Sequence, residues 1–323
     1  MKIVVTGGCG YIGSHVARAF KQHFPDSRIY IIDRERRGHT LRGTDGFLHS
    51  DYASKQSLMW ITEIAPQVIV HCAGDILVGE SVDNPAKYYD NNVAKTITLL
   101  SHVKSLKQLP LILFSSSASV YGNPASTPVL ESAPIQPISP YGISKSITER
   151  LLADYNGAYK LPSVCFRYFN ACGAEPVNHN LGQALGASHI IARLLEAKIR
   201  NLPFTLNGND YATPDRTCIR DYVHVWDLAD AHIRATEWAL GQTTKSAAVF
   251  NLGTKHGISN QEIIDYVLSK YGSVEIKIGA RRPGDPDCLV ADAGLAHQVL
   301  QWNPAHSTID QIIDSAWQWY NRV

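Results

Sequence analysis

The sequence predicts an α/β protein whose main part is a doubly wound parallel sheet, with a smaller α/β domain interleaved with it. Short apolar runs alternate with helical patterns through the first half of the chain, as repeated βαβ units require. These runs are continuously apolar, which suits strands covered by helices on both faces. After about Asn170 the pattern changes to shorter elements around a loop rich in Asn, Gly and Pro.

The main sheet should begin at the N-terminus, because its expected strands and helices alternate from there. The expected strands are Lys2–Thr6, Arg28–Ile32, Gln67–His71, Leu109–Ser115 and Ser163–Tyr168. The expected helices are Ile12–Phe24, Lys55–Ile64, Tyr88–Leu106 and Tyr141–Tyr159. This order is typical of a doubly wound sheet.

The second half should contain the smaller domain and one return to the main sheet. We expect a loop over Glu175–Gly186, and then a helix over His189–Ile199 and a strand over Pro203–Leu206. The chain should return to the main sheet through Tyr222–Val225, the helix Trp226–Leu240 and the strand Ala248–Leu252. Two further helices should follow, over Asn260–Tyr271 and Ile309–Tyr320. The predicted domains are therefore 1–171 with 222–252, and 172–221 with 253–323.

Composition excludes several classes of protein. The 323 residues are 45% hydrophobic, enough for a sizeable core, and the net charge is +1. No run of like charge is long enough to indicate a nucleic-acid or membrane surface. The longest apolar stretches are strand-sized, and the start of the chain lacks the apolar region of a signal peptide.

Cysteine and histidine spacing argues against a metal site. The cysteines are scattered, which favours buried free thiols in a reducing cytoplasm: Cys9, Cys72, Cys165, Cys172, Cys218 and Cys288. The 13 histidines include no pair at a metal-ligand spacing. We therefore expect no metal.

A glycine-rich turn follows the first expected strand and opens a helix. It reads Gly8-x-Gly10-x-x-Gly13, and Gly7 adds a second overlapping pattern. Glycine lets the backbone approach a pyrophosphate, and the helix N-terminus offers N–H groups to it. Asp33 ends the second strand, where a carboxylate accepts bonds from an adenosine ribose and repels a 2′-phosphate. This Rossmann-type pattern favours NAD, although the neighbouring Arg34 leaves NADP open.

A second group of residues indicates redox chemistry. The triplet Ser115 to Ser117 ends a strand, at the edge of the sheet where ligands bind. Tyr141 and Lys145 stand one helical turn apart. A free tyrosine has a pKa of about 10, too high for a base at neutral pH. A lysine ammonium and a cationic nicotinamide would both favour the phenolate, and Ser117 could bond the same substrate oxygen.

With these motifs the sequence resembles the UDP-glucose/UDP-galactose 4-epimerase family of extended short-chain dehydrogenases/reductases, over nearly the whole chain. The matching segments are Thr6–His15, His71–Gly74, Val78–Ser81, Tyr88–Val93, Phe114–Gly122, Ser139–Lys145, Arg167–Asn170, Gly208–Tyr211, Arg220–Val225 and Arg281–Asp285.

The resemblance implies three groups of site residues. The catalytic group is Tyr141 as base, Lys145 orienting it and shifting its pKa, and Ser117 assisting. The NAD-binding group adds to Tyr141 and Lys145 the residues Gly7, Gly10, Tyr11, Ile12, Gly13, Asp33, Arg34, Asp51, Tyr52, Cys72, Ala73, Gly74, Asn91, Ser115 and Tyr168. The UDP-sugar group adds to Ser117 and Tyr141 the residues Asn170, His189, Arg220, Arg282, Asp285 and Leu289. Arg220 and Arg282 could instead form structural ion pairs with Asp221 or Asp285.

The implied reaction is inversion at C4 of a UDP-hexose through a 4-keto sugar. A sugar-nucleotide dehydratase would need an acid/base pair where this chain has Ala118 and Ser119. A net dehydrogenase or reductase would exchange its cofactor in each turnover, and a non-catalytic NAD sensor would not need the Ser/Tyr/Lys group. The family also implies a homodimer through the helices of Asn92–Leu106 and Tyr141–Tyr159, although an apolar helix face packs equally well inside a monomer.

Four departures from the family bear on the cofactor and substrate contacts. Ile76 replaces a lysine often found two residues after the Ala-Gly pair, and the segment between Asp33 and Asp51 is short. The segment Gly186–His189 aligns poorly. Leu289 is smaller than the tyrosine of strict glucose/galactose enzymes, so N-acetylated sugars, or UDP-pentoses, become candidate substrates.

Overall fold

The computed structural model describes residues 1–178, 180–244, 246–281 and 285–322, and it contains the predicted parallel sheet. The sheet has seven strands in the order β10-β6-β5-β4-β1-β2-β3, and every neighbouring pair is parallel. Their bounds are β1 Lys2–Thr6, β2 Arg28–Asp33, β3 Gly46–His49, β4 Val68–His71, β5 Leu111–Ser117, β6 Ser163–Tyr168 and β10 Ala247–Leu252. The predicted fold class is confirmed.

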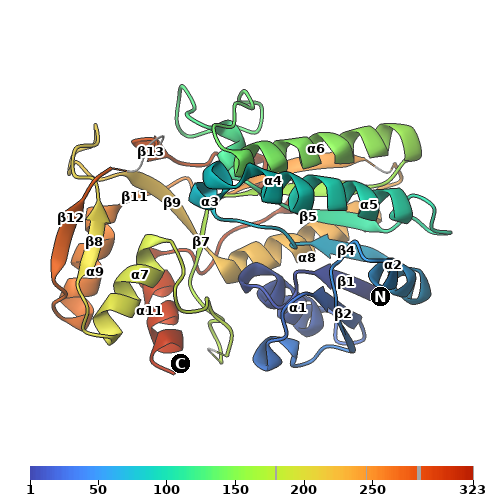
Figure 1. Ribbon diagram of the computed structural model, residues 1–323, viewed down its shortest axis with the longest axis horizontal. Helices are drawn as coiled ribbons and strands as arrows, with labels where there is room; N and C mark the ends of the chain where they lie inside the picture. The colour runs from blue at the N-terminus through green and yellow to red at the C-terminus, as the bar shows by residue number, and fades with distance from the viewer. Residues whose placement is uncertain (179, 245, 282–284, 323) are drawn as a thin grey trace.

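Helices cover both faces of this sheet, as the continuously apolar strands predict (Figure 1). One face packs against α1 (Tyr11–His23), α8 (Val225–Gly241) and α10 (Gly294–Leu300). The other packs against α2 (Lys55–Ile64), α5 (Lys95–Val103) and α6 (Pro140–Tyr159). In β1 the neighbours Ile3 and Val4 are both 0% exposed and belong to the cores on opposite faces.

The second half forms a separate core beside the sheet, on the left in Figure 1. It is built from the following elements: β8 (Phe204–Asn207) and β12 (Ile276–Gly279), which pair in parallel, with α7 (Ile190–Ile199), α9 (Asn260–Tyr271) and α11 (Ile309–Tyr320). A small sheet lies between the two cores; its strands are β7 (Asn170–Cys172), β9 (Ile219–His224), β11 (Gly257–Ser259) and β13 (Cys288–Leu289).

Two of the predicted segments form different elements in the structure. The segment Tyr222–Val225 does not return to the main sheet, since β9 pairs with β7, β11 and β13 instead. Only α8 and β10 make the return. The expected helix Tyr88–Leu106 is divided into α4 (Pro85–Tyr88), a π-helical turn over Tyr89–Ala94, and α5. A π turn inserts an extra residue and often marks a functional site. A short helix, α3 (Val78–Asp83), precedes them.

The chain order creates a switch point between β1 and β4. From β1 the chain first moves to β2 and β3 on one side, and then crosses to β4, β5, β6 and β10 on the other. Ligands of open parallel sheets bind in the crevice at such a point, beyond the carboxyl ends of the strands. In the described ranges no helix is both long and apolar enough to cross a membrane.

Four buried histidines should make the fold sensitive to acid. Burial lowers the pKa of His71 and His224 to about 3, and that of His15 and His232 to about 4. In the unfolded chain a histidine titrates near pH 6.5, so below that pH the unfolded state binds protons that the native state rejects. Stability should therefore be intact above about pH 6.5 and fall toward pH 4, by about 1.4 kcal/mol per pH unit for each fully titrating group.

Urea midpoints measured between pH 7 and 5 check this expectation. A His232→Gln variant should show a shallower dependence, because one of the titrating groups is gone. Equal midpoints at pH 7 and pH 5 in the wild type would contradict the argument.

Candidate active site

The glycine turn has the close backbone packing that the motif predicts. A Cβ on Gly13 would lie 2.3 Å from the Gly7 oxygen, and one on Gly7 would lie 2.6 Å from the Ala73 nitrogen. Gly7 also has φ +72°, in the region that favours glycine. At Gly10, by contrast, a Cβ would meet only the Gly7 oxygen, at 3.2 Å. Gly10 begins α1 without a capping side chain, so this exposed backbone fits a pyrophosphate.

Asp33 connects this turn to the end of β2. Its carboxylate accepts the backbone N–H of Cys9 at 2.9 Å and that of Glu35 at 2.9 Å. Asp33 thus lies beside the turn, at the carboxyl end of the sheet. This position fits the predicted role of the carboxylate in accepting hydrogen bonds from the adenosine ribose. Tyr11 and Ile12 form the first turn of α1, and the Tyr11 hydroxyl donates to the Gly173 oxygen at 2.7 Å.

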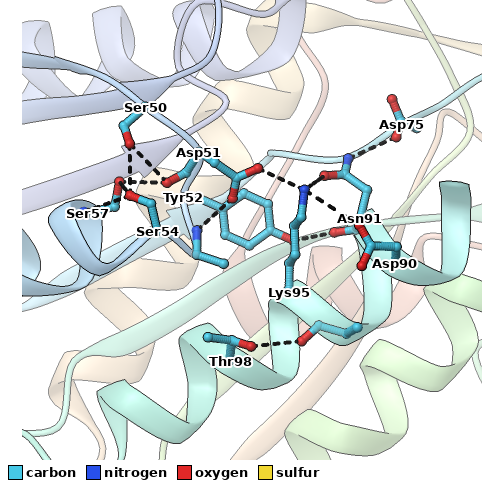
Figure 2. Close-up of polar contacts among 12 residues, drawn as sticks. Ser50, Asp51, Tyr52, Ser54, Ser57, Asp75, Asp90, Asn91, Lys95 and Thr98 are labelled. Carbon is cyan, nitrogen blue, oxygen red and sulfur yellow. Dashed lines mark hydrogen bonds and ion pairs between the residues drawn. The ribbon is translucent and has the colours of Figure 1, made fainter.

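A polar cluster lies at the same edge of the sheet, where it joins the segment after β3 to the segment before α5 (Figure 2). Lys95 donates to Asp51 at 2.9 Å and to Asn91 at 3.4 Å, and Asn91 donates to Asp75 at 2.9 Å. The Tyr52 hydroxyl donates to the Asn91 backbone oxygen. The structure thus brings together Asp51, Tyr52 and Asn91, which the resemblance assigns to the cofactor.

The middle of the crevice has a neutral wall. The Ser115 hydroxyl donates to Cys72 Sγ at 3.1 Å and lies 3.1 Å from the Tyr168 hydroxyl, which in turn lies 2.8 Å from His232. Burial raises the pKa of Cys72 to about 11, so it is a thiol at neutral pH. Ala73 and Gly74 continue this wall, and a Cβ on Gly74 would lie 3.8 Å from Lys145 Nζ.

Tyr141, Lys145 and Ser117 meet at this wall. Ser139 caps α6 by accepting the Gly142 N–H at 3.2 Å, which places Tyr141 in the first turn of the helix. Lys145 is buried, donates to the Ser115 oxygen at 2.8 Å, and lies 5.8 Å from the centre of the Tyr141 ring. Ser117 lies at the end of β5 and hydrogen-bonds the Tyr141 side chain.

The electrostatics of the pair differ from the sequence-based expectation. Burial raises the pKa of Tyr141, and the hydrogen bond with Ser117 offsets this only in part. Burial also lowers the pKa of Lys145 to about 8, although Cys72 and Glu149 act in the opposite direction. The expected lowering of the tyrosine pKa by Lys145 is therefore not achieved by the protein's own groups, because desolvation dominates for both side chains.

A buried ion pair lies next to the serine triplet and is hydrogen-bonded to its middle residue, Ser116. Arg167 on β6 donates to Glu149 on α6 at 2.6 Å and 3.0 Å, and Ser116 donates to the same carboxylate at 2.5 Å. Arg167 also donates to the Tyr121 hydroxyl at 2.8 Å. This network fixes β5, β6 and α6 relative to one another.

The predicted substrate residues line a second cavity between β7, β8, β9 and α7. It has a volume of about 200 Å³, and its walls include Asn170, His189, Arg220 and Asp285. Arg220 and Asp285 form an ion pair across it, while Asp221 instead accepts the backbone N–H groups of Thr254 and Ala291. The ion pair of Arg220 with Asp285, which the sequence left open, is thus present in the structure.

Two further residues were predicted to bind the UDP-sugar. Leu289 on β13 is the register partner of Arg220 on β9, so it adjoins the cavity. Arg282 lies outside the described residues. Most of the residues predicted to bind the UDP-sugar are thus adjacent in the structure although they are separated in the sequence: Asn170, His189, Arg220, Asp285 and Leu289.

The sequence did not identify several residues of the substrate cavity and of the cofactor region. Arg193 and Phe204 line the substrate cavity, with the Arg193 guanidinium 5.6 Å from the Phe204 ring centre. Asp75 and Lys95 contact Asn91 in the cofactor region. The spacing of Lys95, one helical turn after Asn91, was a signal that could have identified it.

Taken together, a parallel sheet with a glycine turn at its switch point and a Ser/Tyr/Lys group beside it defines a dinucleotide-dependent enzyme of the extended short-chain dehydrogenase/reductase class. Comparison with known proteins gives the family. A model of the "NAD dependent epimerase/dehydratase family" matches residues 3–253, and the chain belongs to this family.

Relatives of the full length carry a more specific name. A protein of Rhizobium meliloti named UDP-glucose 4-epimerase is 41% identical and is aligned over 99% of this chain and 97% of its own. The crystal structure of UDP-glucose 4-epimerase from Brucella ovis in complex with NAD has a TM-score of 0.92 at 38% identity, covering 98% and 97% of the two chains. The enzyme from Stenotrophomonas maltophila, with bound NAD and formylated UDP-arabinopyranose, has a TM-score of 0.93 at 32% identity, covering 100% and 98%.

Breaking the ion pair next to the triplet should destabilise the fold. Glu149 and Arg167 have side chains that are 8% and 6% exposed, so Glu149→Leu would leave a buried guanidinium without its carboxylate. The expected loss is about 3–5 kcal/mol of unfolding free energy, measured by urea denaturation. Asp154→Leu, which removes the exposed partner of Arg150 on the same helix, should cost less than about 1 kcal/mol. Similar losses for the two variants would contradict the interpretation.

Proposed function

We propose that this protein inverts C4 of a UDP-hexose with NAD, interconverting UDP-galactose and UDP-glucose. The observation that carries the proposal is the presence of two sites in one chain. The crevice with Tyr141 and Lys145 fits redox chemistry, and the cavity with Arg220 fits a nucleotide. The full-length similarity to UDP-glucose 4-epimerases supports the same conclusion.

We further propose a division of labour between the two parts. Residues 1–171 and 222–252 hold NAD, and residues 172–221 and 253–323 hold the UDP-sugar. The pairing of β9 with the small sheet supports moving residues 222–224 to the substrate part in this proposal. Arginine suits diphosphate recognition, since its planar fork bonds two oxygens at once. Arg220 would hold the diphosphate, and Asp285 would hold the nucleoside.

Tyr141 would act as the base at the 4-hydroxyl of the sugar. Its phenolate takes the hydroxyl proton as the C4 hydrogen leaves, and returns that proton after the 4-keto sugar has presented its other face. Bound NAD supplies the acceptor, and later the donor, of the C4 hydride, and its positive ring in the oxidised state favours the phenolate. The positive ring would thus offset the effect of burial, which raises the pKa of Tyr141 in the protein itself.

Ser117 and Lys145 would prepare Tyr141 for this role. Ser117 hydrogen-bonds the phenol, so it can also bond the substrate oxygen that Tyr141 deprotonates. Lys145 is anchored by the Ser115 oxygen at 2.8 Å, which keeps its charge near the tyrosine and the ribose side of the crevice. The sugar must turn between the two hydride steps, so its binding has to be looser than that of the diphosphate.

A dehydratase fits the site less well. It must protonate a leaving hydroxyl, and the residues after Ser117 are Ala118 and Ser119, neither of which is an acid at neutral pH. Ala118 is also buried.

We propose a homodimer and a cytoplasmic location as well. The helices α5 and α6 would form the interface, and they expose apolar side chains such as Ile97 and Tyr159, which are 39% and 44% exposed. The six cysteines are all free thiols, which suits a reducing compartment.

The direct test uses the purified protein with UDP-galactose and no added NAD. UDP-glucose should form, because the cofactor regains its original state in each cycle, and denatured protein should release NAD. Absence of UDP-glucose, even with NAD supplied, would overturn the proposal.

Tyr141→Phe should lower turnover by about 10²–10⁴-fold, since it removes the proton-transferring oxygen. Calorimetric binding of UDP should stay close to that of the wild type, because Tyr141 is not among the walls of the substrate cavity. Tyr159→Phe is the matched control on the same helix, at an exposed position, and should keep full activity. A fully active Tyr141→Phe enzyme would refute the base assignment.

Leu289 should admit larger sugars. An open groove of about 650 Å³ lies beside it, lined by residues 123–127 and 285–288. We expect the wild type to act on UDP-N-acetylglucosamine, and Leu289→Tyr to lose that activity while keeping UDP-galactose turnover. Coupled assays on both substrates measure the ratio. No detectable wild-type rate on UDP-N-acetylglucosamine would exclude this specificity. The bound pentose in the Stenotrophomonas maltophila enzyme makes UDP-pentoses a further substrate to assay.

A further inference from the structure

Two separate segments of the chain meet at one edge of the crevice. Asp51 and Tyr52 follow β3 and precede α2, and Asn91 lies in the π-helical turn before α5. They come from strands and helices on opposite sides of the switch point, so nothing in the local chain fixes their separation. Figure 2 shows them converging on one lysine, Lys95.

Lys95 joins the two segments through its side chain. Its Nζ donates to Asp51 Oδ2 at 2.9 Å and to Asn91 Oδ1 at 3.4 Å. Tyr52 makes a second connection, because its hydroxyl donates to the Asn91 backbone oxygen and lies 3.2 Å from Thr96 Oγ1. The two connections close a ring of contacts around the edge of the crevice.

The same contacts fix the orientation of the Asn91 amide. Its Oδ1 faces the Lys95 ammonium, and its Nδ2 donates to Asp75 Oδ2 at 2.9 Å. A carboxylate accepts only from the amide NH₂, and an ammonium donates only to the amide oxygen. A flipped amide would lose both bonds, so Lys95 and Asp75 together hold one rotamer.

Lys95 is one of two lysines that balance the acidic side chains in this place, since Lys87 lies 3.6 Å from Asp75. Asp51, Asp75 and Asp90 are neighbours, and Lys95 also lies 3.7 Å from Asp90. Ile76, which stands where a lysine is common in the family, is apolar and 62% exposed. Lys95 holds the pKa of the Asp51 carboxyl below its usual value, against the effect of burial, together with the Ala53 N–H and Arg34.

We propose that Lys95 is a positioning residue for the cofactor, which holds Asp51 and Asn91 in the geometry that receives the adenosine end of NAD. Asp51 Oδ1 accepts the Ala53 N–H at 2.9 Å, and Oδ2 accepts from Lys95, so both oxygens are oriented while lone pairs remain for a ligand. The inference rests on the proposed NAD site and adds to it a residue that the family motifs do not contain.

The test is retention of NAD by the purified full-length protein. Lys95→Met keeps the length of the side chain and removes its charge, and the lysine is 28% exposed, so the fold should tolerate the change. We expect the NAD dissociation rate to rise about tenfold, equivalent to about 1.4 kcal/mol. We also expect Lys95→Arg to restore most of the retention, because a guanidinium can donate to both partners.

Lys104→Met serves as the matched control. Lys104 follows α5 directly, with its ammonium 4.4 Å from the Tyr159 ring centre, and it should retain NAD like the wild type. Thermal unfolding of NAD-free samples separates positioning from folding, since Lys95→Met should match Lys104→Met there.

Three outcomes are distinct. Faster NAD loss in Lys95→Met, with rescue by Lys95→Arg and equal unfolding temperatures, supports the inference. Wild-type retention in Lys95→Met, or equal loss in both substitutions of Lys95 accompanied by lowered stability, overturns it. A wild-type protein that binds no NAD would instead refute the proposed function.

Discussion

The buried ammonium of Lys145 is the constraint on which the rest of the active site depends. A charge in this position must be compensated, and the compensation comes from three groups: the Ser115 oxygen at 2.8 Å and the Phe114 ring at 4.9 Å, both on β5, and the field of Glu149 one turn along α6. Glu149 is in turn held by Arg167 on β6. The position of Tyr141 is therefore determined by a polar network through two strands and a helix, and not by its own contacts alone.

Much of the fold could be predicted because the main sheet is buried on both faces. Its strands had to be continuously apolar, and β4, with all of Val68–His71 buried, is the clearest case. The small sheet could not be predicted in the same way. Strands such as β11 and β13 span Gly257–Ser259 and Cys288–Leu289 only, and pairing between distant segments decides their existence. The assignment of Tyr222–Val225 to the main sheet was wrong for this reason, since β9 pairs with β7, β11 and β13, which are distant from it in the sequence.

The parts of the candidate site that depend on backbone conformation could be predicted from motifs. The hydrogen-bond and ion-pair partners of side chains could be predicted much less well. Gly7 and Gly13 lie as the glycine pattern requires, because a Cβ at either position would overlap with neighbouring backbone atoms. The pKa of Tyr141, by contrast, depends on burial that the spacing to Lys145 does not reveal. Arg220 had two candidate partners, Asp221 and Asp285, and only the alternation of side chains along β9 selects Asp285. The contacts of Lys95 likewise require the three-dimensional arrangement of two distant segments.

The alternation along β9 separates two kinds of inherited change. Arg220 faces the cavity, whereas the adjacent Asp221 is 0% exposed and bonds to backbone groups of Thr254 and Ala291. Under the proposed function, a replacement of Arg220 should mainly alter ligand affinity, whereas a replacement of Asp221 should mainly lower the amount of folded protein. Two adjacent positions of one strand are therefore subject to different selective pressures.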